Sequence, residues 1–241
     1  MSIRTTIIQS LVHINEKIIF YPKLKTYYKN HLQQGNPVIV DVGSNKGQSI
    51  DFFLDLNPNC KIFGFEPNKN LYELLLKKYK NNQNIVLFNA GISDSIGKLV
   101  FRENIMDETS TFEDLNFQSE YLIRKARILG VTPQNLIKSS YEVDVLTLSK
   151  FIEEKGLGLI DVLKIDTEGH EYKCLLGLFD HVDLSRTPIK FIQLESHNDD
   201  MYLNKNGDIN SLLQENKYAI DATIKHGFGD FEELVYKTAS K

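Results

Sequence analysis

Apolar positions along the chain alternate between two patterns. Short runs of apolar, often β-branched residues are typical of buried strands, and longer segments between them have helical spacing. After the first run, for example, an apolar stripe occurs at Ile50, Phe53 and Leu54. The strand-like runs are residues 38–42, 61–65, 85–88, 160–165 and 191–195. Strands that alternate with helices in this way predict an α/β fold with a mostly parallel sheet.

The C-terminal pattern differs. A helical segment at residues 209–215 precedes two strand-like runs, 218–224 and 231–236, which are joined by a turn that contains Gly227 and Gly229. A glycine turn between two strand patterns favours antiparallel pairing. The predicted sheet therefore ends in an antiparallel pair.

The regular alternation is lost between residues 99 and 141. Short strands are expected at residues 98–101 and 142–146, with an acidic, Ser/Thr-rich loop at 107–114 and a helix at 120–129 between them. Because long irregular segments in compact domains are often functional, we expect a substrate-binding insertion near residues 104–140. The helix in this insertion carries a basic cluster of Arg124, Lys125 and Arg127. The cluster could bind an anionic substrate, but we favour the interpretation that it faces solvent.

The first 36 residues form a separate predicted helical segment, and Gly35-Asn-Pro37 marks the start of the domain at residues 37–241. Apolar residues with helical spacing follow one another at Ile3, Ile7, Leu11, Ile14 and Ile18. Polar residues interrupt this patch too early for a secretory signal. We expect a helix packed on the core or over the mouth of the site, with binding to a membrane surface as the alternative, and no stable membrane insertion.

A glycine loop follows the first strand, in the sequence Asp41-Val-Gly-Ser-Asn-Lys-Gly47. Gly43 and Gly47 allow the backbone to turn tightly and to approach a ligand. A dinucleotide-binding turn has Gly-x-Gly-x-x-Gly spacing and faces a pyrophosphate. Asp41 would repel a phosphate but suits an ammonium or sulfonium ion. The loop therefore predicts a site for S-adenosylmethionine (SAM) rather than NAD.

Two further strand ends support this interpretation. Glu66 ends the second strand, 19 residues after Gly47, where an acid accepts hydrogen bonds from ribose hydroxyls. Asn89 and Ala90 follow the third strand and are expected to border the adenine. Each feature alone is common in α/β proteins, but their order along the chain indicates one cofactor site.

The fourth strand ends in the acidic sequence Asp166-Thr-Glu-Gly-His-Glu171, and the fifth ends at Glu195, shortly before His197. Methylation of a hydroxyl requires a general base or a metal that lowers the hydroxyl pKa. We rank Asp166 first as base, with His170 and Glu195 as helpers. The clustered carboxylates of Asp166, Glu168 and Glu195 would favour Mg²⁺ over Zn²⁺. The alternative is that some of these groups only hydrogen-bond the SAM amino group or cap the next helix, and for Glu171, already inside that helix, we favour this alternative.

With these motifs the chain resembles the FkbM family of SAM-dependent methyltransferases. The resemblance rests on residues 41–47, 65–68, 89–94 and, most specifically, 163–171, and extends from about Val38 to the C-terminus. It implies a class I methyltransferase (Rossmann-like) fold with a seven-stranded sheet, and O-methylation of a sugar, glycan or natural product. The expected cofactor residues are Asp41, Gly43, Ser44, Asn45, Gly47, Glu66, Pro67, Asn89, Ala90 and Asp166. Ser44 replaces the alanine common in the family, and residues 112–138 form a longer stretch than usual.

Composition limits the alternatives. The 241 residues carry a net charge of −4, which gives no overall electrostatic attraction for nucleic acid. The chain also lacks the Asn/Asp-Pro-Pro-Tyr/Phe motif of base methyltransferases, so a nucleic-acid methyltransferase is the weaker alternative. A second alternative, a non-catalytic SAM-fold or nucleotide-sugar-binding module, should lack the acidic cluster. Cys60 and Cys174 have no metal or redox spacing, and we expect both to be reduced, in a cytoplasmic protein.

Overall fold

The computed structural model describes residues 16–106, 109–180, 182, 184–196, 199–203, 207–226 and 232–239. Its main sheet has seven strands in the order β3-β2-β1-β7-β8-β10-β9, and β10 is antiparallel to both of its neighbours. The predicted mostly parallel sheet with a C-terminal antiparallel pair is thus confirmed. The strands are β1 (Val38–Val42), β2 (Lys61–Phe65), β3 (Ile85–Phe88), β7 (Ile160–Ile165), β8 (Ile189–Ser196), β9 (Tyr218–Lys225) and β10 (Glu232–Thr238).

Strand order reverses between β1 and β7. The chain adds β2 and β3 on one side of β1, and β7 and β8 on the other. In open α/β sheets, ligands bind outside the carboxyl ends of the strands at such a switch point. The topology therefore places the glycine loop after β1 beside the acidic sequence after β7.

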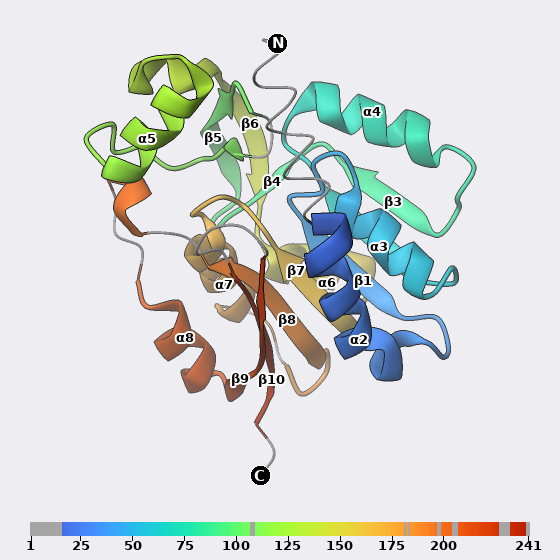
Figure 1. Cartoon of the computed structure of the whole chain (residues 1–241). Helices are drawn as coiled ribbons and strands as arrows, with labels where there is room; N and C mark the ends of the chain where they lie inside the picture. Colours follow the sequence, from blue (N-terminus) through green and yellow to red (C-terminus); the bar gives the residue numbers. More distant parts are fainter. Residues whose placement is uncertain are drawn as a thin grey trace.

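Helices cover both faces of the sheet (Figure 1). On one face, α2 (Tyr21–Leu32) and α3 (Gln48–Leu56) pack on a core cluster that contains Tyr28, Phe53 and Phe191. α2 follows a π-helical turn, η1 (Glu16–Phe20). α4 (Lys69–Tyr79) contributes Tyr79 to the same cluster.

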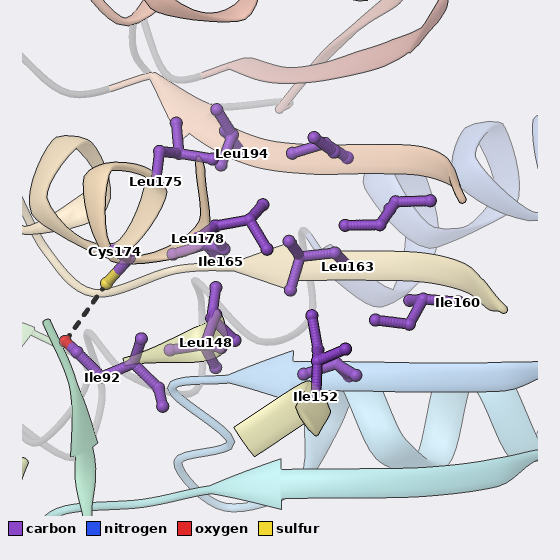
Figure 2. Close-up of a cluster of buried hydrophobic side chains, with 14 of the residues drawn as sticks. Ile92, Leu148, Ile152, Ile160, Leu163, Ile165, Cys174, Leu175, Leu178 and Leu194 are labelled. Carbon is purple, nitrogen blue, oxygen red and sulfur yellow. Dashed lines mark hydrogen bonds between the residues drawn. The ribbon is translucent and has the colours of Figure 1, made fainter. Parts of the chain in front are cut away.

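The opposite face carries α6 (Leu148–Lys155), α7 (Glu171–Phe179) and α8 (Ile209–Glu215). Figure 2 shows how Leu175 and Leu178 of α7 lie over Leu163 and Ile165 of β7. In the same cluster, Cys174 donates a hydrogen bond to the carbonyl of Ile92, with Sγ and O 3.3 Å apart. Both cysteines are free and buried, as expected of core residues.

The irregular central segment builds a second sheet that the sequence pattern did not predict. It contains β4 (Gly91–Ile92), β6 (Ile137–Leu146) and β5 (Gly97–Asn104), in that order. The two strands expected here exist, but both are longer than predicted because residues 97–104 and 137–146 pair antiparallel along their whole length. Figure 1 shows this sheet beside α5 (Glu120–Leu129), a helix found at its predicted bounds.

The segment between β5 and β6 has a hydrophobic cluster of its own. Leu122, Ala126 and Leu129 of α5 pack there with Met201 and Tyr202. Short 3₁₀ turns flank the cluster, η3 (Pro133–Leu136) and η4 (Asp199–Met201). This cluster packs α5 against the residues that follow β8.

Some sequence-based expectations fall outside the described residues. These are residues 3–15 of the helix expected over residues 3–18, the turn at Gly227 and Gly229, and the placement of His197. The last residues of that expected helix lie in η1. Among the described helices, none has the length and apolar character that crossing a bilayer requires.

Candidate active site

A cavity of about 630 Å³ lies at the carboxyl ends of β1, β2, β7 and β8. Gly43, Glu66 and Asp166, which directly follow β1, β2 and β7, line it together with Glu195 near the end of β8. Residues from α2, α3 and α5 form its sides. The cavity is therefore located at the topological switch point, where the strand-end residues were expected to converge.

The glycine loop wraps over the end of β2. The backbone N–H groups of Gly43 and Ser44 both donate to the carbonyl of Phe65, at 3.0 and 2.9 Å. Gly43 has a φ of +86°, and Asn45 is also left-handed at +46°. These turns bring Gly43, Ser44 and Asn45 to the cavity wall, as the sequence pattern predicts of a ligand-binding loop.

Glu66 is held in one orientation at the tip of β2. Its Oε2 accepts a hydrogen bond from the Asn45 N–H at 2.7 Å, and its Oε1 accepts one from the Asn68 N–H at 2.8 Å. The side chain is 4% exposed and still lines the cavity, next to Pro67. A fixed, buried carboxylate of this kind is suited to accept hydrogen bonds from ligand hydroxyls.

Three half-buried carboxylates converge at the carboxyl ends of β7 and β8. Single oxygens of Asp166, Glu168 and Glu195 all lie within 4.8 Å of one another, and we call these residues the acidic group. Lys164 donates to Asp166 Oδ2 at 2.9 Å. Burial alone would lower the pKa of Lys164, but the carboxylates of Asp166, Glu233 and Asp41 raise it above its ordinary value. A permanent positive charge therefore orients Asp166.

Glu168 has a backbone conformation that side chains rarely adopt, with a φ of +53°. Its carbonyl accepts a hydrogen bond from Thr111 Oγ1 at 2.6 Å. Gly169 follows at +94°, and a Cβ atom there would overlap the ring of Tyr202. Contacts from distant parts of the chain thus hold the turn that carries Glu168.

Three predicted cofactor residues lie behind the cavity wall rather than in its lining. Asp41 is fully buried on the α3 side of the sheet, where its Oδ2 accepts from Ser49 at 2.8 Å, and burial raises the pKa of its carboxyl. Gly47, at a φ of +83°, is the N-cap of α3. Asn89 donates to the carbonyls of Glu66 and Pro67, while Ala90 lines the cavity. The contact of these three residues with the cofactor stays a prediction.

His170 also lies outside the cavity lining, so we correct its expected place near the reacting centre. The ring is 1% exposed, with Nδ1 2.6 Å from Glu113 Oε1 and Nε2 2.9 Å from the Ser93 hydroxyl. Both nitrogens are therefore engaged in a buried network. Glu171 begins α7 and accepts from the N–H groups of Thr167 and Gly169, in agreement with the structural role expected for it.

The structure adds polar lining residues that the sequence analysis missed. Gln193 Nε2 donates to Glu233 Oε2 at 2.6 Å, and the Tyr28 hydroxyl donates to Gln193 Oε1 at 2.9 Å. Gln193, Glu233 and Lys164 all line the cavity. The sequence did contain a signal for these residues, because a polar residue within an otherwise apolar strand needs a hydrogen-bond partner once it is buried.

Comparison with known proteins identifies related sequences. A family model described as the methyltransferase FkbM domain matches residues 41–220. The 2-O-methyltransferase NoeI of Sinorhizobium fredii is 27% identical over 179 residues, which are 71% of this chain and 68% of NoeI. The methyltransferase sdnD of Sordaria araneosa is 30% identical over 171 residues, which are 64% of this chain and 65% of sdnD.

A solved structure with a similar fold is the putative rRNA-methylase from Clostridium thermocellum. Its TM-score is 0.51 at 10% sequence identity, and the alignment covers 92% of this chain and 97% of that one. At this identity the similarity concerns the fold alone. It agrees with the Rossmann-like strand order described above.

Proposed function

Because the chain belongs to the FkbM methyltransferase family, we propose that it transfers the methyl group of SAM to a hydroxyl of a sugar, glycan or natural product. The family match and the methyltransferase relatives confirm the predicted SAM-dependent methyltransferase. The acceptor and the roles of individual residues form the proposal. One observation carries it, namely that the glycine loop and the acidic group line the same cavity.

We assign the methyl donor to the β1–β2 side of the cavity. Gly43, Ser44 and Asn45 would hold its amino acid part, and Glu66 would accept hydrogen bonds from the ribose hydroxyls. Pro67 and Ala90 would border the adenine. The fit is supported by the position of the loop in the cavity lining and by the fixed orientation of the Glu66 carboxylate.

The acidic group would remove the acceptor proton. In the reaction an acceptor oxygen forms a bond to the methyl carbon, the carbon–sulfur bond breaks, and its electron pair stays on the thioether product. The hydroxyl proton must move to a base at or before attack. Asp166 lies at the centre of this proposal, with Glu195 as its nearest helper, since their carboxylate oxygens lie within 4.8 Å of each other.

Mg²⁺ is the second arrangement that the acidic group permits. Three carboxylate oxygens within 4.8 Å are ligands that a hard cation prefers. A bound cation would lower the hydroxyl pKa and so replace a protein base. Activity after exhaustive treatment with EDTA, with and without added Mg²⁺, separates the two arrangements.

The test uses SAM with a deuterated methyl group and a panel of sugars, oligosaccharides and hydroxylated natural products. Mass spectrometry should detect acceptors heavier by one CD₃ group, and NMR should place that group on an ether oxygen. Asp166→Asn should form far less product while it still binds SAM. Transfer of the label to RNA or to protein lysine, with none to hydroxyl acceptors, would show that the acceptor class is wrong.

A further inference from the structure

One side of α5 faces the cavity. The α5 residues that line it are Tyr121, Arg124, Lys125, Ile128 and Leu129, whose spacing places them along one side of a helix. Leu122 and Ala126 point to the hydrophobic cluster instead. Two of the three basic residues noted in the sequence are thus directed to the cavity, and not only to solvent as expected.

Arg124 and Lys125 gather around one aromatic ring. The guanidinium of Arg124 and the ammonium of Lys125 each lie 5.9 Å from the centroid of the Tyr121 ring. Within the described part of the chain, Arg124 forms no ion pair with a carboxylate. A guanidinium at a cavity wall without an acidic partner is suited to bind an anionic ligand.

The acidic group lines the same cavity as Tyr121. Burial raises the pKa of the Tyr121 hydroxyl to about 12, and the charges of Glu168 and Glu195 add to this while Arg124 opposes it. Positively charged side chains of α5 and the negatively charged acidic group therefore line the same cavity. A ligand with a negative group and a neutral hydroxyl would be oriented here, because the acidic group repels its negative end.

We propose that the acceptor is a phosphorylated sugar whose phosphoryl group binds Arg124, with Lys125 as a second cation. This proposal rests on the proposed function and specifies its substrate class. The phosphoryl group would lie against α5, and the sugar would extend toward the acidic group with a hydroxyl in reach of Asp166. Arginine matches phosphate with two parallel hydrogen bonds, so it contributes geometry as well as charge.

Arg127 offers a matched control on the same helix. It lies three residues after Arg124 and lines a second pocket of about 410 Å³, whose lining also includes Arg124, Tyr121, Glu120 and Asp200. It is not part of the lining of the main cavity. Arg127→Gln therefore removes a positive charge from α5 without changing the lining of the main cavity.

The experiment is isothermal titration of the protein saturated with S-adenosylhomocysteine. The probes are inorganic pyrophosphate, glucose 1-phosphate, UDP-glucose and, as the neutral reference, glucose. At least one phosphorylated probe should bind, at least tenfold more tightly than glucose and less tightly at higher salt. Arg124→Gln should weaken that binding by tenfold or more, and Arg127→Gln by less than twofold. Comparing glucose 1-phosphate with UDP-glucose distinguishes a monophosphate from a nucleoside diphosphate acceptor.

Failure to bind any phosphorylated probe, or equal effects of Arg124→Gln and Arg127→Gln, would overturn the proposal. The affinity for S-adenosylhomocysteine, measured first in each variant, should be unchanged because neither arginine touches the donor loop. If that ligand itself does not bind the unaltered protein, the proposed function fails instead. The two failures are therefore distinguishable.

Discussion

A Cβ atom on Gly43 would overlap the backbone carbonyl oxygen of Asp166. The glycine loop after β1 and the acidic sequence after β7 therefore touch backbone to backbone, and the Asp166 N–H donates to the Val42 carbonyl at 3.0 Å. This contact joins the proposed donor-binding loop to the proposed reacting centre. It also explains why this position requires glycine for space as well as for its positive φ.

The first prediction concerns Gly43→Ala. The added methyl group should push the loop away from Asp166, so the variant should be less stable and should lose SAM binding. Gly156→Ala is the control, since Gly156 has a φ of +59° but open space around its Cβ position. The control should cost only the left-handed backbone penalty, about 1–2 kcal/mol. Thermal unfolding and SAM titration measure both effects. Equal behaviour of the two variants would show that the contact with Asp166 is unimportant.

The second prediction concerns Glu66→Ala. Loss of a charged hydrogen-bond acceptor should weaken SAM binding by about 1.5–3 kcal/mol, or about 10- to 150-fold in Kd. Titration calorimetry gives this value directly. Glu73→Ala, which removes an exposed carboxylate from α4, should leave the Kd unchanged. If Glu66→Ala binds SAM as tightly as the unaltered protein, Glu66 does not contact the ribose.

The third prediction separates the possible roles of Asp166. If Asp166 takes the acceptor proton, Asp166→Asn should lower kcat by about 10²- to 10⁴-fold and leave the Kd for SAM nearly unchanged. A residue that only anchors SAM would instead raise that Kd and preserve turnover at saturation. Asp144→Asn, in an exposed part of β6, serves as the control. A loss of activity in EDTA that Mg²⁺ restores would assign the acidic group to a metal.

The fourth prediction concerns the buried network of Glu113 and His170. Burial alone would raise the pKa of the Glu113 carboxyl, but the hydrogen bond and charge of His170 and the charge of Lys173 hold it below its ordinary value of 4.5. A carboxylate with a lowered folded-state pKa stabilises the fold fully above its unfolded pKa. This contribution is lost as the pH falls through the folded-state pKa.

Glu113→Gln should therefore destabilise the protein at neutral pH by about 1–3 kcal/mol. The difference from the unaltered protein should shrink as the pH falls below 4.5. Unfolding by urea at several pH values measures it. Asp114→Asn is the control, because Asp114 pairs with Arg102 at a half-exposed position and such pairs contribute little. A destabilisation that does not vary with pH would contradict this interpretation.

The strand-end residues were predictable because the strand order follows from local sequence. Gly43, Glu66 and Asp166 each come directly after an apolar run, and parallel strands bring their ends to one edge. Asp41 was expected in the cofactor site, but its side chain lies on the α3 side of the sheet and outside the cavity lining. Its neighbour Val42 packs in the core cluster on one face of the sheet, so the side chain of Asp41 points to the other.

Non-local contacts account for the remaining differences. The ring of His170 is buried by Glu113, which lies 57 positions earlier in an irregular segment that no periodic pattern places. The second sheet depends on pairing between residues 97–104 and 137–146, which are separated by the α5 segment. Gln193, in contrast, is a polar residue within an apolar strand, and its position in the site could have been inferred from that alone.

The most direct test of the central claim is titration of the unaltered protein with SAM and, separately, with NADH. The glycine loop, the fixed Glu66 carboxylate and the acidic group, which line one cavity, predict saturable binding of SAM at one site per chain and no binding of NADH. Binding of NADH without binding of SAM would contradict the assignment of the cavity to a methyl donor.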